Sequence, residues 1–213
     1  MDGFPATGRR PPALLLLGPT GAGKTPLGYL LETRGLWRQK YLHFDFGENL
    51  RTVVSRNKPD ESITAGDIEF LRGVLSSGAL LEDEHFPLAK RLLHSFLLRR
   101  RHDGQACIVL NGLPRHVGQA RALDSILDVR VVVCLKCSTE TVLRRIESDI
   151  GGDRGGRQDD EIDALRKRLE IFHQRTSPLV AYYRRRGVRN VTIPVMPSTT
   201  PEEMWDVLSA TES

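Results

Sequence analysis

Residues 18–25 read Gly-Pro-Thr-Gly-Ala-Gly-Lys-Thr, which fits the pattern G-x-x-x-x-G-K-[ST]. The apolar run Leu14–Leu17 comes directly before this stretch and a helical pattern follows it, which is the strand–loop–helix context that the pattern requires. Its three glycines let backbone N–H groups turn inward around phosphate oxygens, and the helix adds the positive end of its dipole. Lys24 would reach the β- and γ-phosphates, and the Thr25 hydroxyl would bind Mg²⁺. The stretch therefore predicts a site for a nucleoside triphosphate with Mg²⁺.

Short apolar runs alternate with longer helical patterns along the rest of the chain. The runs are Ala13–Leu17, Tyr41–Phe44, Cys107–Leu110, Val129–Leu135 and Val188–Val195. The helical patterns lie at residues 23–34, 66–76, 84–100, 114–127, 139–149 and 159–186, and a last one follows Pro201. This alternation predicts an α/β fold in which helices cover both faces of a parallel sheet, with the functional loops at the carboxyl ends of the strands.

Two stretches interrupt the alternation. Several helical patterns lie between Phe44 and Cys107, which predicts a small helical insertion. Residues 150–158 contain four glycines with arginines among them, which predicts a mobile, cationic loop. Residues 1–12 are rich in glycine and proline and are expected to form a disordered tail.

The bulk composition suits a single soluble domain. The chain has 213 residues, a net charge of +4 and an isoelectric point near 9.1. That charge would fit a polyanion partner or a mildly basic surface, and its small size favours the surface, so we expect no nucleic-acid partner. The run Ala13–Leu17 is too short to cross a membrane, so no membrane association is expected.

The three cysteines point to a reducing, cytoplasmic location. Cys134 and Cys137 have the spacing of zinc ligands, but no second pair completes a four-ligand shell. We therefore expect buried or inert thiols.

Arginines recur at positions that could surround a phosphoryl group. Asn111-Gly-Leu-Pro-Arg115 follows an apolar run, so Arg115 should lie at the carboxyl end of a strand and face the glycine-rich loop. Arg145, Arg157 and Arg168 follow later in the chain. Because arginine has a fixed charge and a planar fork of donors, it suits this role better than lysine does.

From Leu14 to about Gly187 the sequence resembles the adenylate kinase family of nucleoside monophosphate kinases. The stretch Asn111–Gln119 looks like the family signature D-G-[FY]-P-R-x-x-x-Q. Residues 157–160 read Arg-Gln-Asp-Asp, and Lys-Arg-Leu and Thr-Ser-Pro-Leu-Val-Ala-Tyr-Tyr follow, which is similar to G-R-x-D-D…K-R-L…T-x-P…Y-Y. The loop before Arg157 is short, as in short-lid members of the family.

The resemblance implies a fold and an activity. The fold would be the three-layer P-loop NTPase fold with a parallel five-stranded sheet, formed by one domain over residues 13–213. A monophosphate-binding insertion would cover about residues 46–80, and a short lid about residues 148–158. The activity would be Mg²⁺-dependent transfer of phosphate from ATP to a nucleoside monophosphate, above all AMP, by a cytoplasmic monomer.

The resemblance also assigns residues by position. ATP would contact Gly21, Ala22, Gly23, Lys24 and Thr25, and Arg145 would stack on its base. The monophosphate would contact Phe46, Arg51, Ala79, Leu80, Leu81, Gly112, Arg115, Gln119, Arg157 and Arg168, with Gln119 reading the adenine edge. The catalytic cations would be Lys24, Arg115, Arg157 and Arg168, and Asp159 and Asp160 would orient the lid arginines. Thr25 would hold Mg²⁺, with Asn111 acting on it through water.

Four places depart from the family pattern, and one of them, Lys24-Thr-Pro in place of K-G-T, still fits the general phosphate-loop rule. Asn111 stands where the family has a metal-supporting aspartate, so we expect Asn111→Asp to speed turnover or lower the Mg²⁺ requirement. Phe46 replaces a threonine beside the AMP base, which weakens the case for AMP. Asp149 replaces a lid arginine, and Arg154 would supply that charge.

These departures leave two alternatives open. The chain could phosphorylate CMP, UMP or a small hydroxyl compound, or it could bind nucleotides with little catalysis. A GTPase is disfavoured because the sequence lacks an N-K-x-D motif, and a motor ATPase because the expected metal-binding aspartate is replaced by Asn111.

Overall fold

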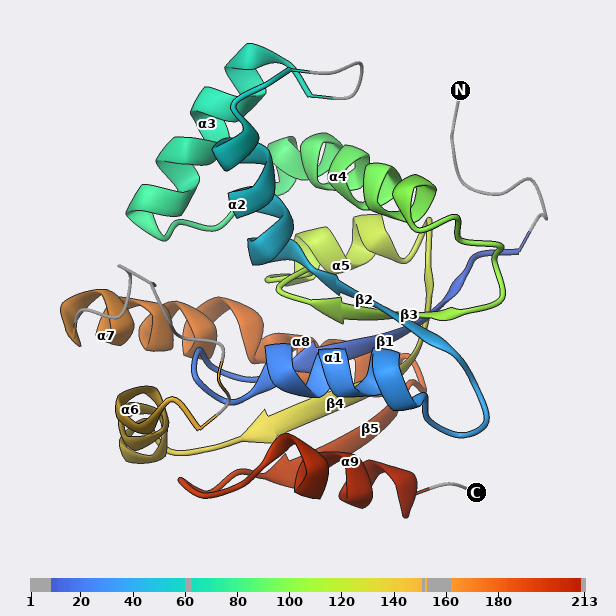
Figure 1. Ribbon diagram of the computed structural model, residues 1–213, viewed down its shortest axis with the longest axis vertical. Coiled ribbons are helices and arrows are strands. Elements are labelled where there is room, and N and C mark those ends of the chain that lie inside the picture. The colour runs from blue at the N-terminus through green and yellow to red at the C-terminus, as the bar shows by residue number, and fades with distance from the viewer. Residues whose placement is uncertain (1–8, 60–62, 151, 153–161, 212–213) are drawn as a thin grey trace.

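The computed structural model describes residues 9–59, 63–150, 152 and 162–211 (Figure 1). The sites expected at Arg154, Arg157, Asp159 and Asp160 lie outside the described residues, as do most of the expected lid and residues 1–8 of the expected tail. The elements run in the order β1 (Pro12–Leu17), α1 (Lys24–Arg34), β2 (Tyr41–Asp45), α2 (Phe46–Arg56), α3 (Ala65–Ser77), η1 (Asp83–His85), α4 (Phe86–Arg99), β3 (Cys107–Asn111), α5 (Val117–Leu123), β4 (Asp128–Lys136), α6 (Thr139–Ser148), α7 (Ile162–Ile171), η3 (Phe172–Thr176), α8 (Pro178–Arg185), β5 (Arg189–Pro194) and α9 (Pro201–Ser209).

The strands form one parallel sheet in the order β2-β3-β1-β4-β5, which confirms the predicted fold class. All strand arrows run toward the left of Figure 1, where α6, α7 and the end of α3 gather. The carboxyl ends of the strands therefore share one edge of the sheet, and β1 reaches that edge between β3 and β4. This is the edge at which open parallel sheets bind ligands.

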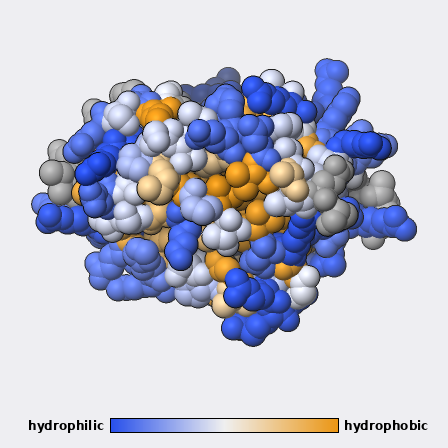
Figure 2. Space-filling model, turned by 90° about the horizontal axis from the view of Figure 1, so that it is seen from below, coloured by the Kyte–Doolittle hydropathy of each residue, from blue (hydrophilic) through white to orange (hydrophobic). Residues whose placement is uncertain are grey.

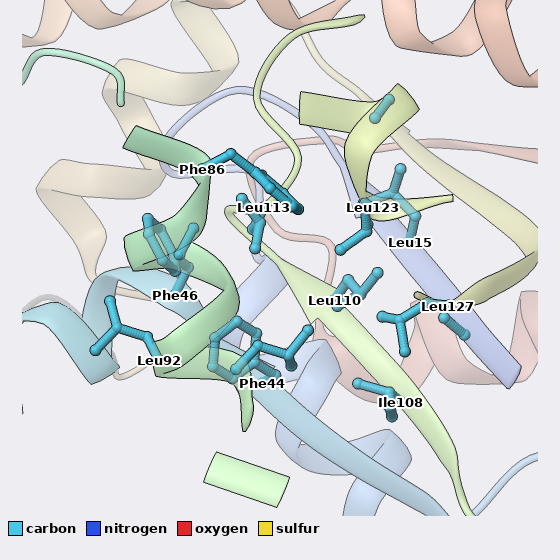
Figure 3. Close-up of a cluster of buried hydrophobic side chains, with 14 of the residues drawn as sticks. Leu15, Phe44, Phe46, Phe86, Leu92, Ile108, Leu110, Leu113, Leu123 and Leu127 are labelled. Atoms are coloured by element: carbon cyan, nitrogen blue, oxygen red, sulfur yellow. The ribbon is translucent and has the colours of Figure 1, made fainter. Parts of the chain in front are cut away.

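Two apolar layers pack against the two faces of the sheet, because alternate side chains of each strand point to opposite faces. Leu15 faces one layer with residues of α4, α5 and α8, and Figure 3 shows it beside Leu110, Leu123 and Leu127. Leu14 belongs to the other layer, with residues of α1 and α9. Nearly continuous apolar strands are thus explained by burial on both faces.

The structure differs from the predicted helices in two places. It has a helix, α2, where none was predicted, and it has two helices where the sequence predicted one. The stretch that forms α2 has apolar residues at helical spacing, Phe46, Leu50, Val53 and Val54, which pack on the core, and Asp45 caps the helix by accepting a hydrogen bond from the backbone N–H of Glu48. The pattern expected at 159–186 is, in its described part, two helices separated by the π-helical turn η3. Turns of this kind are frequent at functional sites.

The contact between α1 and β2 depends on the absence of a side chain at Gly28. The His43 ring lies against this glycine, and a Cβ added there would lie 2.3 Å from His43 Nε2. His43 is buried, and neither ring nitrogen has a hydrogen-bond partner in the described part of the chain. Burial lowers the pKa of His43, so the ring is held neutral.

We expect Gly28→Ala to destabilise the protein by about 1–3 kcal/mol through overpacking, although alanine is the better helix former. Gly73→Ala in α3 is the matched control, because a Cβ there meets no atom within 4 Å. It should instead stabilise by about 0.5–1 kcal/mol. Urea denaturation measures both, and equal effects of the two changes would contradict the packing described at His43.

The face seen in Figure 2 is hydrophilic around its rim, with apolar side chains gathered near its centre. In the described ranges, none of the helices has the length and apolar character needed to cross a bilayer. The three cysteines are free, and burial raises the pKa of each thiol, to about 12 for Cys107. These thiols are therefore protonated and weakly reactive at neutral pH.

Candidate active site

A cavity of about 220 Å³ opens at the carboxyl edge of the sheet. It is lined by the loop after β1, the start of α2, the segment after α3, the loop after β3, and parts of α7 and η3. Of the residues expected to bind ATP, it includes Gly21, Gly23, Lys24 and Thr25. Of those expected to bind the monophosphate, it includes Phe46, Arg51, Ala79, Leu80, Leu81, Gly112, Arg115, Gln119 and Arg168. The fold thus brings segments from both halves of the chain around one space.

The glycine-rich loop has the backbone that its sequence predicts. Gly21 and Gly23 have φ angles of 75° and 94°, a region that glycine adopts without strain. Lys24 Nζ donates hydrogen bonds to the carbonyls of Gly18 at 2.8 Å and Pro19 at 2.7 Å. The ammonium is therefore held at the mouth of the loop by its own backbone. Ala22 faces inward and is fully buried.

Thr25, Asp45 and Asn111 form a hydrogen-bonded group beside the loop. The Thr25 hydroxyl donates to Asp45 Oδ2 at 2.7 Å, and Asn111 Nδ2 donates to the same oxygen at 2.7 Å and to Thr25 Oγ1 at 3.0 Å. Asp45 and Asn111 meet because they are register partners at the ends of β2 and β3. Asp45 was not among the expected site residues, although an acidic residue directly after the apolar run Tyr41–Phe44 is a signal for a functional role.

The donor set of this group fits Mg²⁺. A hydroxyl oxygen and a carboxylate oxygen are the hard ligands that this ion takes, and it usually keeps several waters when it binds a nucleotide. Thr25 and Asp45 supply these two oxygens next to the phosphate loop. The amide of Asn111 faces the carboxylate as a donor.

Arg115 and Arg168 converge on the cavity from different elements. Arg115 lies in the loop between β3 and α5, and Arg168 comes from α7. Loss of hydration, together with the nearby charge of Arg168, lowers the pKa of Arg115 to about 10. The Arg168 guanidinium also passes over Gly78, where an added Cβ would lie 3.6 Å from its Nε. Two cations held close together in this way form a receptor for an anion.

The backbone of Arg115 is fixed from two sides. Its N–H donates to Gln119 Oε1 at 2.7 Å, and its carbonyl accepts a hydrogen bond from Thr176 Oγ1 at 2.8 Å. Thr176 is the last residue of η3, so the π-helical turn holds the loop that carries Arg115. The sequence analysis placed Thr176 in a family signature but gave it no function.

Gln119 also holds the segment expected to line the monophosphate pocket. Its Nε2 donates to the Leu81 carbonyl at 2.8 Å, and His116 Nε2 lies 3.0 Å from the same oxygen. An amide has two N–H groups and two lone pairs on oxygen, so one of each is left to pair with a ligand. The expected reading of an adenine edge by Gln119 is compatible with this geometry.

Arg145 lies behind the loop rather than in the lining of the cavity. Its guanidinium donates to the carbonyls of Gly21 at 3.1 Å, Met196 at 2.9 Å and Thr199 at 2.7 Å. It thereby joins the phosphate loop to the segment after β5. The expected stacking of Arg145 on the ATP base stays a prediction.

Phe46 has two environments. Its side chain is buried, and its ring centroid lies 6.1 Å from that of Phe44 in the core (Figure 3). It also lines the cavity beside Gly112, where an added Cβ would lie 3.5 Å from Phe46 Cβ. Phe46 therefore forms an apolar part of the wall beside the loop that carries Arg115.

Comparison with known proteins agrees with this geometry. The family model described as "Adenylate kinase" matches residues 16–188. The chain belongs to the adenylate kinase family. A protein named adenylate kinase from Parvibaculum lavamentivorans is 33% identical over 183 residues, covering 82% of this chain and 80% of that protein. One from Synechococcus sp. strain WH7803 is 34% identical and covers 82% and 86%, and one from Thermus thermophilus is 32% identical and covers 83% and 85%.

The structure suggests why one position departs from the adenylate kinase family pattern, namely the asparagine at position 111. The family aspartate is replaced by Asn111, and the carboxylate stands on the neighbouring strand at Asp45. An aspartate at position 111 would lie against Asp45 as a second negative charge. The expectation that Asn111→Asp speeds turnover stays a prediction, and the carboxylate of Asp45 beside Asn111 argues against it.

Proposed function

We propose that this member of the adenylate kinase family transfers the γ-phosphate of ATP to AMP and forms two molecules of ADP. The observation that carries the proposal is the convergence of Lys24, Arg115 and Arg168 on one cavity that begins at the phosphate loop. Two phosphate chains repel each other, and cations on several sides of one space are what would bring them together.

The acceptor needs no general base, since a phosphate oxygen of AMP is already anionic at neutral pH. The loop and Lys24 hold the phosphates of ATP, while Arg115 and Arg168 hold the phosphate of AMP and the group in transfer. When bound, Mg²⁺ neutralises charge on the phosphate oxygens of ATP. Thr25 and Asp45 are the residues placed to hold it. Arg157 and the acidic pair Asp159 and Asp160 are proposed to join the site from the lid.

AMP is the proposed acceptor because Gln119 presents an amide to the cavity. An amide can accept from the amino group of adenine and donate to the neighbouring ring nitrogen. Arg51, at the cavity wall on α2, is proposed to bind the phosphate of AMP. Phe46, in place of a polar residue, favours a looser choice of base, so CMP and UMP remain the competing acceptors.

We further propose that the chain acts as a cytoplasmic monomer without a nucleic-acid partner. Its protonated thiols suit a reducing compartment. Lys24, Arg51, Arg115 and Arg168 line the cavity, where their charges would face a nucleotide rather than a nucleic acid.

A coupled assay of ADP formation tests the proposal. With Mg²⁺-ATP held constant, we expect kcat/KM for AMP to exceed that for GMP, CMP and UMP at least tenfold, because a hydrogen-bonding site discriminates strongly against bases that leave it unpaired. Gln119→Leu should remove most of that preference. A higher value for CMP or UMP would assign the other acceptor, and ADP release without any acceptor would contradict transfer to a monophosphate.

A further inference from the structure

We propose that Asp45 is the carboxylate that supports Mg²⁺ in this enzyme, and that Asn111 positions it. The inference rests on the proposed function only in taking Mg²⁺-ATP as the ligand. It assigns the metal-supporting charge to β2, whereas the family pattern has it at the position of Asn111 on β3.

Asp45 lies beside the hydroxyl of the phosphate loop that would bind the metal. Its Oδ2 lies 2.7 Å from the hydroxyl of Thr25, the residue that the phosphate-loop motif assigns to the metal. Asp45 lines the same cavity as Lys24 and the loop glycines. A carboxylate at this point therefore faces the space that the β- and γ-phosphates with their metal would occupy.

The carboxylate of Asp45 is buried without an ion-pair partner among the described residues. The residue is only 7% exposed, and it makes no salt bridge with any residue that the structure describes. Its hydrogen-bond donors are neutral: the Thr25 hydroxyl, the Asn111 amide and the backbone N–H of Glu48. Burying a carboxylate costs free energy unless it is paired or binds a metal. The Arg51 guanidinium lies nearby, since Arg51 Nη1 and Asp45 Oδ1 would each lie 3.4 Å from a Cβ added at Gly47, but it makes no salt bridge with Asp45. A divalent cation in the cavity would supply a directly bound positive charge.

Asn111 complements Asp45 as a hydrogen-bond donor. Its amide donates to Asp45 Oδ2 at 2.7 Å, and an aspartate at position 111 has no proton to donate at neutral pH. Two carboxylates at that separation would repel each other. Asparagine at 111 is thus matched to aspartate at 45, and the pair carries one negative charge, as a single aspartate would.

Three variants test this assignment: Asp45→Asn, Asn111→Asp and the double variant that exchanges the two side chains. Asparagine is as good a helix cap as aspartate, so α2 keeps its start in Asp45→Asn. Calorimetry measures the affinity for ATP with Mg²⁺ and for ATP in EDTA. The matched control is Glu48→Gln, which removes a charge from an exposed position of the same helix.

We expect Asp45→Asn to weaken the binding of Mg²⁺-ATP about tenfold or more, as loss of a metal-supporting side chain does. The affinity for ATP in EDTA should stay the same or increase, because no metal is present and one negative charge has been removed. Asn111→Asp should not improve the Mg²⁺-ATP affinity, and the exchange should recover most of what Asp45→Asn loses. Recovery by exchange would show that the double variant folds, and retained binding of ATP in EDTA would show the same for Asp45→Asn.

An unchanged ratio of the two affinities in Asp45→Asn would overturn the assignment, as would tighter Mg²⁺-ATP binding by Asn111→Asp alone. These readouts are equilibrium affinities for ATP and need no acceptor. They therefore judge the role of Asp45 even if AMP turns out not to be phosphorylated, and a failed AMP assay with intact Mg²⁺ dependence would count against the proposed acceptor alone.

Discussion

Replacing Arg115 by methionine is expected to lower kcat/KM for AMP by about 10³–10⁵, the effect of an arginine that contacts the phosphoryl group in transfer. The same change should leave the free energy of unfolding without nucleotide unchanged or higher. In the free protein the Arg115 guanidinium is desolvated and faces the like charge of Arg168, which lowers its pKa to about 10. Methionine removes that charge and keeps an apolar side chain of similar length.

This combination separates a catalytic from a structural role for Arg115. Residues placed for function commonly cost stability, whereas removal of a structural ion pair would lower activity and stability together. Arg121→Met is the matched control, since this arginine is exposed on α5, the helix that follows Arg115. Steady-state kinetics and urea denaturation measure the two quantities. A large loss of stability in Arg115→Met would contradict the account.

Replacing Lys24 by methionine should lower kcat by about 10²–10³, the usual cost of removing one group that stabilises charge in a transition state. In the free protein Lys24 Nζ donates to the carbonyls of Gly18 and Pro19 at the mouth of the loop. We expect it to exchange these contacts for phosphate oxygens when ATP binds.

Lys40→Met serves as the control, because this lysine is exposed beside the amino end of β2, at the opposite end of the strand from the cavity. Rapid-quench kinetics of ADP formation, with circular dichroism as a check of folding, measure the effect. Turnover by Lys24→Met within a few-fold of the parent enzyme would show that the lysine does not meet the phosphates.

The parts of the site that depend on local sequence were predictable. The glycine-rich loop is defined by a contiguous motif, and its strand and helix follow from burial patterns on either side. The loop that carries Arg115 was predictable for the same reason, since it directly follows a buried strand. These features need few contacts between distant residues.

The parts that depend on register were not predictable. Asp45 and Asn111 are far apart in the chain, and only the parallel pairing of β2 with β3 brings their side chains together. The helix α2, in contrast, was predictable and was overlooked, since Phe46, Leu50, Val53 and Val54 recur at helical spacing after the cap residue Asp45. The hydrogen bonds from Arg145 to carbonyls of two distant segments were likewise not predictable, and its expected stacking on the ATP base stays a prediction. Hydrogen bonds of this kind leave no local signal in a sequence.

The most direct measurement follows the phosphate itself. The protein is incubated with ATP labelled with ³²P at the γ-position and with unlabelled AMP, and the labelled products are separated after less than one turnover. If the cations of the cavity bring two nucleotides together, the label will appear in ADP and inorganic phosphate will stay at the level of a control without enzyme. Label released as inorganic phosphate, at a rate that AMP does not change, would contradict the account.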